Sequence, residues 1–183
     1  MPLRPITEAD LDKVRSWRNA PQVRQNMYTS HEITEAEHKA WFKRQREDDR
    51  SLWLIYTNKD GQDEGVVSFT NYTSGSGSVF WGFYAAADAS RGVGSRMEVE
   101  ALDHAFTHLK VHKLNCEVLA SNPGVIRLHK KFGFVEEGLF RDYHFTGEQY
   151  IDVVRLGMTA DEWPMHRKAA LERLTAYRKG ACS

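Results

Sequence analysis

A short glycine-containing segment is the strongest chemical signal in this sequence. Residues 90–96 read Ser-Arg-Gly-Val-Gly-Ser-Arg, and they lie between a strand-like run over 79–84 and a helix-like run that starts near Arg96. Glycines let the backbone turn its N–H groups toward one point, and the positive end of the helix dipole adds to their attraction for an anion. The segment therefore predicts an anion-binding turn, although a plain structural turn is the commoner explanation of an isolated Gly-x-Gly.

A second motif follows about thirty residues later. Residues 122–134 read Asn-Pro-Gly-Val-Ile-Arg-Leu-His-Lys-Lys-Phe-Gly-Phe, follow a further predicted strand and open a further predicted helix. Together the two motifs resemble the acetyl-CoA-binding motifs of the GNAT N-acetyltransferase superfamily. The resemblance extends from near Leu3 to about Met158.

Acetyl-CoA is a long anion, and its site needs backbone donors for the pyrophosphate and an open sheet edge for the pantetheine arm. The family usually has Gln or Arg three residues before the first glycine of the turn, whereas this chain has Ala89. Arg91 can supply charge there instead, and Asn122 is either a contact to the cofactor arm or an ordinary helix cap. The resemblance implies that the cofactor contacts Phe83, Tyr84, Arg91, Gly92, Val93, Gly94, Ser95, Arg96 and Asn122.

Acetyl transfer to an amine also needs groups that move protons. The amine attacks as a free base, and the departing thiolate takes up a proton. Many family members use a tyrosine seven residues after the motif asparagine as the acid, and this chain has His129 there. An imidazole with a pKa near 6.5 can donate a proton at neutral pH, although His129 also lies on an apolar stripe where it could simply pack.

Glu117 is the candidate base, acting directly or through water. Strand alternation places Glu117 on the face opposite Cys116, so it need not be a core carboxylate, and a surface glutamate is the simpler explanation of this residue. Its position on the strand just before the second motif favours the catalytic role.

The N-terminal part of the chain is rich in polar and aromatic residues, in the region where this superfamily builds its acceptor pocket. With the later run Tyr-Ile-Asp-Val at 150–153, residues 17–21, 27–33 and 37–42 resemble the subfamily that acetylates the 4-amino group of UDP-4-amino-4,6-dideoxy-N-acetyl-β-L-altrosamine in pseudaminic acid biosynthesis. Arg or His donors suit a diphosphate, and aromatic rings suit a uracil or sugar face. The resemblance implies that the UDP-amino-sugar contacts Arg18, Met27, Tyr28, His38, Trp41, Thr70 and Asn71.

Two other functions stay open on the sequence alone. The chain also resembles ribosomal-protein acetyltransferases, which act on a protein N-terminal amine. A non-catalytic acyl-CoA-binding or regulatory module is the second alternative, since Ala89 and His129 both depart from the family pattern.

The composition of the chain limits its domain organisation and the classes of function that it can have. The chain has 183 residues, of which 41% are hydrophobic, and this predicts one domain over 1–183 with a C-terminal helix at about 160–178 as an appendage. Lys and Arg number 25, as do Asp and Glu, which excludes the broad basic surface of a general nucleic-acid binder. Two cysteines indicate neither a disulfide framework nor a metal site, and the N-terminus lacks a signal-peptide core. We expect a cytoplasmic protein that uses no metal and binds neither nucleic acid nor membrane, and a homodimer is left open.

The predicted elements alternate along the chain. Apolar patterning and turn residues predict strands at 3–6, 52–56, 65–71, 78–85, 113–119, 134–143 and 150–158, with hairpin turns at 58–61, 74–77 and 146–148. Helical spacing predicts helices from Thr7 to before Pro21, from the capping box Thr34 to Glu37 onward, at about 94–109, over 125–132 and from near Pro164. The resemblance implies an α/β (α+β) fold of the GNAT type, with a central mixed, mostly antiparallel twisted sheet flanked by helices.

Overall fold

The computed structural model of the chain describes residues 2–72 and 77–179, with side chains up to 175. Seven strands form one sheet in the order β1-β2-β3-β4-β5-β7-β6. They are β1 Leu3–Pro5, β2 Leu52–Thr57, β3 Asp63–Thr70, β4 Ser78–Ala85, β5 Lys113–Leu119, β6 Val135–Phe145 and β7 Tyr150–Thr159. The β4–β5 pair is parallel and the other pairs are antiparallel, which confirms the predicted mixed, mostly antiparallel sheet.

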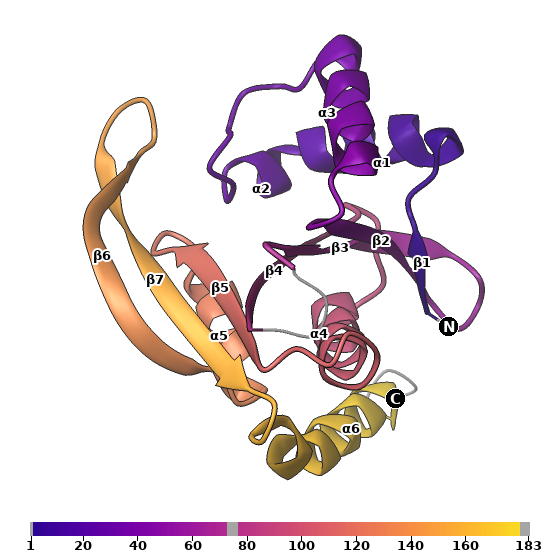
Figure 1. Cartoon of the computed structure of the whole chain (residues 1–183), viewed down its shortest axis with the longest axis vertical. Coiled ribbons are helices and arrows are strands. Elements are labelled where there is room, and N and C mark those ends of the chain that lie inside the picture. The colour runs from indigo at the N-terminus through magenta and orange to yellow at the C-terminus, as the bar shows by residue number, and fades with distance from the viewer. Residues whose placement is uncertain (1, 73–76, 180–183) are drawn as a thin grey trace.

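Helices cover both faces of this sheet (Figure 1). One group packs over β2 and β3 and consists of a 3-10 turn Glu8–Asp10, α1 Leu11–Asn19, α2 Pro21–Arg24 and α3 Glu35–Glu47. The other face carries α4 Val93–Asp103, a π-helical turn His104–His108, α5 Pro123–Lys131 and α6 Trp163–Lys179. In the described part of the chain, no helix is long and apolar enough to cross a membrane.

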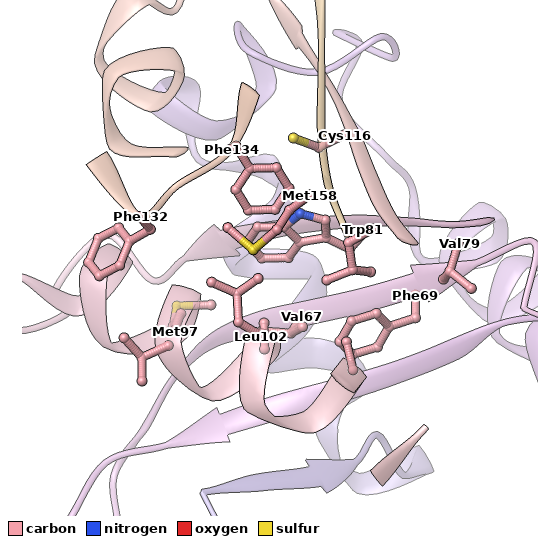
Figure 2. Close-up of a cluster of buried hydrophobic side chains, with 14 of the residues drawn as sticks. Val67, Phe69, Val79, Trp81, Met97, Leu102, Cys116, Phe132, Phe134 and Met158 are labelled. Carbon is pink, nitrogen blue, oxygen red and sulfur yellow. The ribbon is translucent and has the colours of Figure 1, made fainter. Parts of the chain in front are cut away.

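Two clusters of buried side chains hold the layers together. A small cluster fixes α1 and α3 to the sheet and includes Val14, Phe42 and Ile55. The larger cluster lies between the sheet, α4 and α5, and Figure 2 shows Trp81, Phe132, Phe134 and their neighbours within it. Burying one such large side chain contributes about 1.5–3 kcal/mol to the stability of the fold. The larger cluster therefore holds α4 and α5 firmly against the sheet.

Local sequence signals explain several boundaries. The backbone N–H of Glu37 donates to Thr34 Oγ1 at 3.2 Å, and the N–H of Thr34 donates to the Glu37 carboxylate at 2.7 Å, which confirms the predicted capping box. The first helix ends at Asn19, before Pro21, as predicted. Pro21 then begins the four-residue helix α2, which the sequence analysis did not include.

The structure differs from the predicted pattern in two further places, and one predicted turn cannot be compared. The helix predicted at 94–109 changes at His104 into a π-helical turn, in which the N–H of Leu109 donates to the carbonyl of His104 at 3.0 Å. β5 is buried on both faces, so the face that carries Glu117 is not a surface: Asn115 on that face lies in the core and donates to the carbonyl of Val79 at 3.2 Å. Residues 74–76 of the predicted 74–77 turn lie outside the described residues.

Candidate functional site

The sheet opens between β4 and β5. These strands pair over three residues, from Ser78 with Lys113 to Phe80 with Asn115, and then diverge (Figure 1). Beyond Phe80, the end of β4 and the end of β5 line opposite walls of a cleft of about 930 Å³. Because the missing ladder leaves backbone groups of β4 free, the cleft presents an unpaired strand to an extended ligand.

The cleft gathers most of the predicted site residues. Its lining includes Arg18, Met27, Tyr28, His38, Trp41, Phe83, Tyr84, Glu117, Asn122 and His129. The predicted substrate residues Thr70 and Asn71 are not part of this lining, because β3 ends there, opposite Phe80. The glycine turn at 91–96 also lies outside the lining and forms the entry to α4.

The glycine turn has the backbone conformation that the sequence predicts. Gly92 caps α4 in the left-handed region at φ 80°, where other residues are strained. The first-turn amides of a helix have no acceptor within that helix, and here the N–H of Val93 donates to the carbonyl of Ser90 at 3.1 Å, so the amides of Gly94 and Ser95 are the ones that could meet an anion. A Cβ on Gly94 would lie 3.3 Å from Leu128 Cδ2 and 3.7 Å from Phe83 Cε2, so this glycine lets α4 pack closely on its neighbours.

The two arginines of the turn have different environments. Arg96 forms an ion pair with the buried Glu64 at 3.3 Å and donates to the carbonyl of Arg91 at 2.9 Å. Glu64 also accepts the backbone N–H of Ser90 at 3.0 Å. The Arg96 side chain therefore stabilises the turn from inside, while the side chain of Arg91 is exposed and can face an anionic ligand.

Glu117 is held at the wall of the cleft by two partners. Arg155, its register partner on β7, donates to Oε1 at 2.9 Å, and the hydroxyl of Tyr28 donates to Oε2 at 2.8 Å. Burial and the bond to Glu117 raise the pKa of Tyr28 well above its usual value, so this phenol keeps its proton. The guanidinium of Arg155 lies 4.1 Å from the ring centre of Phe80. Glu117 is thus an oriented carboxylate that links β5 to the loop after α2.

His129 is buried where α5 meets α4. Its Nδ1 lies 2.8 Å from Oε1 of Glu98, and the two side chains are 3% and 0% exposed. Burial alone would lower the pKa of His129, but the Glu98 carboxylate and the Cys116 thiol outweigh it and raise the pKa to about 10. Aromatic rings, including Trp81 and Phe134, surround the imidazole. His129 therefore carries a proton at neutral pH, as a general acid must.

Sequence reasoning missed Glu98 and Arg155. Glu98 lies four residues before Leu102 and seven before Ala105, on the apolar stripe of its helix. A carboxylate on an apolar stripe indicates a buried polar contact, so the sequence could have identified this residue. Arg155 had no such signal, because its contact with Glu117 depends on the register between β5 and β7.

The side of the cleft under α1 and α3, which we call the acceptor side, carries Arg18, His38, Trp41, Arg44 and Trp53. Arg18 Nη2 donates to the carbonyl of Thr29 at 2.7 Å, whereas Nη1 is buried and has no hydrogen-bond partner among the described residues. Burial lowers the pKa of Arg18 and that of His38. His38 stacks on Trp41 with ring centres 5.0 Å apart, and Trp41 meets Trp53 edge-on. The acceptor side thus combines an unpaired cation with aromatic surfaces.

Over residues 2–72 and 77–179, no group of three or more His, Cys, Asp or Glu side chains could hold a metal ion.

Comparisons with known proteins agree with this geometry. Residues 1–135 match the family model described as an acetyltransferase (GNAT) domain. The chain is 28% identical over 140 residues to the acetyltransferase PseH of Campylobacter jejuni, covering 76% of this chain and 85% of that protein. It is 41% identical over 56 residues to the spermidine N(1)-acetyltransferase of Vibrio cholerae, covering 31% of this chain and 32% of that protein. The solved structure of a V. cholerae spermidine N-acetyltransferase with CoA and spermine has the same fold, with a TM-score of 0.81 at 22% identity over 88% of this chain and 96% of that one.

Proposed function

Because this chain belongs to the GNAT acetyltransferase family and is an acetyl-CoA-dependent N-acetyltransferase, we propose that its acceptor is a UDP-4-amino-4,6-dideoxy sugar. The specific substrate we propose is UDP-4-amino-4,6-dideoxy-N-acetyl-β-L-altrosamine, acetylated on its 4-amino group in pseudaminic acid biosynthesis. The resemblance in the N-terminal segments and the match to the Campylobacter protein over most of both chains support this choice.

The observation that carries the proposal is the unpaired Nη1 of Arg18. A buried guanidinium donor without a partner is costly, and a diphosphate oxygen would satisfy it with a charge-assisted hydrogen bond. Glu37 and Glu117, two carboxylates of the lining, are already engaged, the first with Thr34 and His31 and the second with Arg155 and Tyr28. The free charge on the acceptor side is therefore positive, which favours an anionic nucleotide sugar over a polyamine.

The cleft and the glycine turn fit acetyl-CoA. The amides of Gly94 and Ser95 in the first turn of α4 and the exposed Arg91 suit the pyrophosphate, and the unpaired end of β4 at Phe83 and Tyr84 suits the pantetheine arm. Asn122 accepts the N–H of Val125 at 3.4 Å as a helix cap, which leaves its amide NH₂ for the ligand. When bound, acetyl-CoA supplies the thioester whose acetyl group is transferred.

The proposed proton transfers use the two groups that the cleft orients. Glu117 takes the proton that the ammonium form of the acceptor must lose, directly or through one water. As the new N–C bond forms and the C–S bond breaks, Nε2–H of His129 gives a proton to the sulfur. The attacking nitrogen loses its second proton to solvent water as the amide forms, and His129 recovers a proton from solvent, so the sulfur gains one proton and one proton is released overall.

Gly94→Val is expected to weaken acetyl-CoA binding by more than about tenfold, which is about 1.4 kcal/mol. The reason is that a side chain here meets Leu128 and Phe83 and displaces the first turn of α4 from the pyrophosphate. Isothermal calorimetry measures the affinity, and thermal unfolding shows whether the fold is kept. The matched control is Gly138→Val in β6, where an added Cβ meets nothing within 4 Å. Unchanged affinity in a folded Gly94→Val protein would remove the turn from the cofactor site.

Arg18→Ala and His38→Ala are each expected to raise the KM for the acceptor roughly tenfold or more, with little change in acetyl-CoA affinity. A lost charge-assisted hydrogen bond costs about 1.5–3 kcal/mol. The control is Arg46→Ala on α3, since Arg46 is exposed and pairs with Glu8 outside the cleft. A variant that loses acetyl-CoA affinity instead would show that the acceptor side is misplaced.

Mass spectrometry of the products tests the acceptor itself. The enzyme is incubated with acetyl-CoA and, separately, with UDP-amino-sugars, peptides with a free N-terminal amine, and spermidine. We expect acetylation of the UDP-4-amino-sugar. Transfer to a peptide or to spermidine, with none to any UDP-amino-sugar, would overturn the proposed acceptor.

A further inference from the structure

We propose that Glu98 is a positioning residue for acetyl transfer: its carboxylate holds Nδ1 of His129 and so leaves Nε2 on the side of Cys116, which lines the cleft with His129. This inference rests on the proposed role of His129. Glu98 itself does not line the cleft and acts through the imidazole.

The geometry of the pair is that of an internal acid–base couple. Glu98 is fully buried on α4, and its Oε1 is 2.8 Å from Nδ1 of His129, which is 3% exposed and borders the cleft. Oε2 of Glu98 has no hydrogen-bond partner among the described residues. A buried carboxylate with only one hydrogen-bond partner lowers the stability of the fold. An apolar residue at the same position would not do so. Packing alone therefore does not account for a carboxylate at this position.

The surroundings of His129 determine what the pair can do. Two titratable groups face the imidazole, Glu98 from α4 and Cys116 from β5, while β4 and the segment after α5 contribute the aromatic rings of Trp81, Phe83 and Phe134. Since Glu98 occupies Nδ1, Nε2 is the nitrogen that meets the Cys116 thiol, on the side of the imidazole that serves the cleft. The contacts with Glu98 and Cys116 outweigh the effect of burial on the pKa of His129, so both ring nitrogens keep their protons across the neutral range. After the Nε2 proton has gone to the sulfur, the negative charge of Glu98 favours taking up another.

A spectroscopic test on the wild-type protein needs no acceptor substrate. In protein labelled with ¹⁵N-histidine, the signals of His129 are identified by their loss in His129→Phe. We expect both ring nitrogens of His129 to be protonated at about pH 8, well above the ordinary histidine pKa. A neutral His129 ring at that pH would overturn the proposal, whether or not the UDP-amino-sugar is a substrate.

Glu98→Gln tests the cause of that protonation. Without the carboxylate, burial lowers the pKa of His129 and the contact with Cys116 alone raises it, so that the protonated fraction at about pH 8 should fall about tenfold or more. With the UDP-amino-sugar as acceptor, the ratio of variant to wild-type kcat should fall as pH rises from 6.5 to about 10. A merely structural role would lower kcat by the same factor at every pH.

Glu100→Gln is the matched control, because it removes a half-buried carboxylate from the same helix and Glu100 is absent from the groups that affect His129. We expect it to leave the His129 titration and the shape of the pH profile unchanged. An unaltered His129 titration in Glu98→Gln would overturn the proposal. If Glu98→Gln does not fold, the wild-type measurement still decides the charge of the ring.

Discussion

Replacing His129 with phenylalanine is expected to lower kcat by at least about 100-fold, with modest change in either KM. The imidazole is the proton donor that borders the cleft, and its pKa of about 10 keeps it charged at neutral pH. Phenylalanine suits the ring of aromatic neighbours formed by Trp81, Phe83 and Phe134. Steady-state kinetics under saturating acetyl-CoA and acceptor measures the effect.

The control for His129→Phe separates the loss of the proton donor from a loss of stability. His129→Phe leaves the carboxylate of Glu98 buried without its partner, and breaking a buried pair typically costs about 3–5 kcal/mol of stability. The double variant His129→Phe/Glu98→Leu removes both members and should restore stability without restoring kcat. Near-wild-type kcat in either folded protein would reduce His129 to a packing residue. The proton would then come from Tyr143, a backbone donor or solvent, although Tyr143 is exposed on β6 and does not line the cleft.

Replacing Glu117 with glutamine is expected to lower kcat by at least about 100-fold and to flatten the acidic limb of the pH–rate profile. A general base works only when it is deprotonated, so its loss removes the fall in rate that protonation causes at low pH. Glutamine keeps the shape of the side chain and can still accept a hydrogen bond from Tyr28, but it no longer carries the charge that faces Arg155.

The comparison variant is Tyr28→Phe, which leaves Glu117 ionised beside Arg155 and removes one hydrogen bond. We expect a much smaller loss of kcat in Tyr28→Phe than in Glu117→Gln, with the acidic limb retained. If the acidic limb is the same in Glu117→Gln as in the wild type, Glu117 is a structural ion-pair partner and another group accepts the proton.

Local patterns were sufficient to predict the main elements of the fold. The capping box at Thr34 marks the start of α3, and turn residues mark the hairpins between β2 and β3 and between β6 and β7, because these signals involve neighbours in the sequence. The four-residue helix α2 is too short for helical periodicity to show it. The π-helical turn at His104 was also missed, since it extends the same helix with a small change of hydrogen bonding.

Site residues that belong to a sequence motif or lie next to one could be predicted. Contacts that depend on the register of distant strands could not. His129 and Glu117 were found from the second motif, and Glu98 could have been found on the apolar stripe of its helix. The hydrogen bond from Tyr28 to Glu117 joins residues 89 positions apart, and no local pattern encodes it. Thr70 and Asn71 were assigned by resemblance, and the structure leaves them outside the cleft lining.

The short pairing of β4 with β5 has a consequence for aggregation. Strands that end their ladder early expose unpaired N–H and C=O groups, and such edges can recruit strands from other protein molecules. Here the two internal edges lie inside a cleft that is also walled by Arg18, His38 and Trp41 from α1 and α3. The docking of these two helices on the sheet therefore protects the chain from self-association at the place where it must stay open to an extended ligand. Substitutions in the small cluster of Val14, Phe42 and Ile55, which fixes α1 and α3 to the sheet, would therefore favour aggregation through those edges.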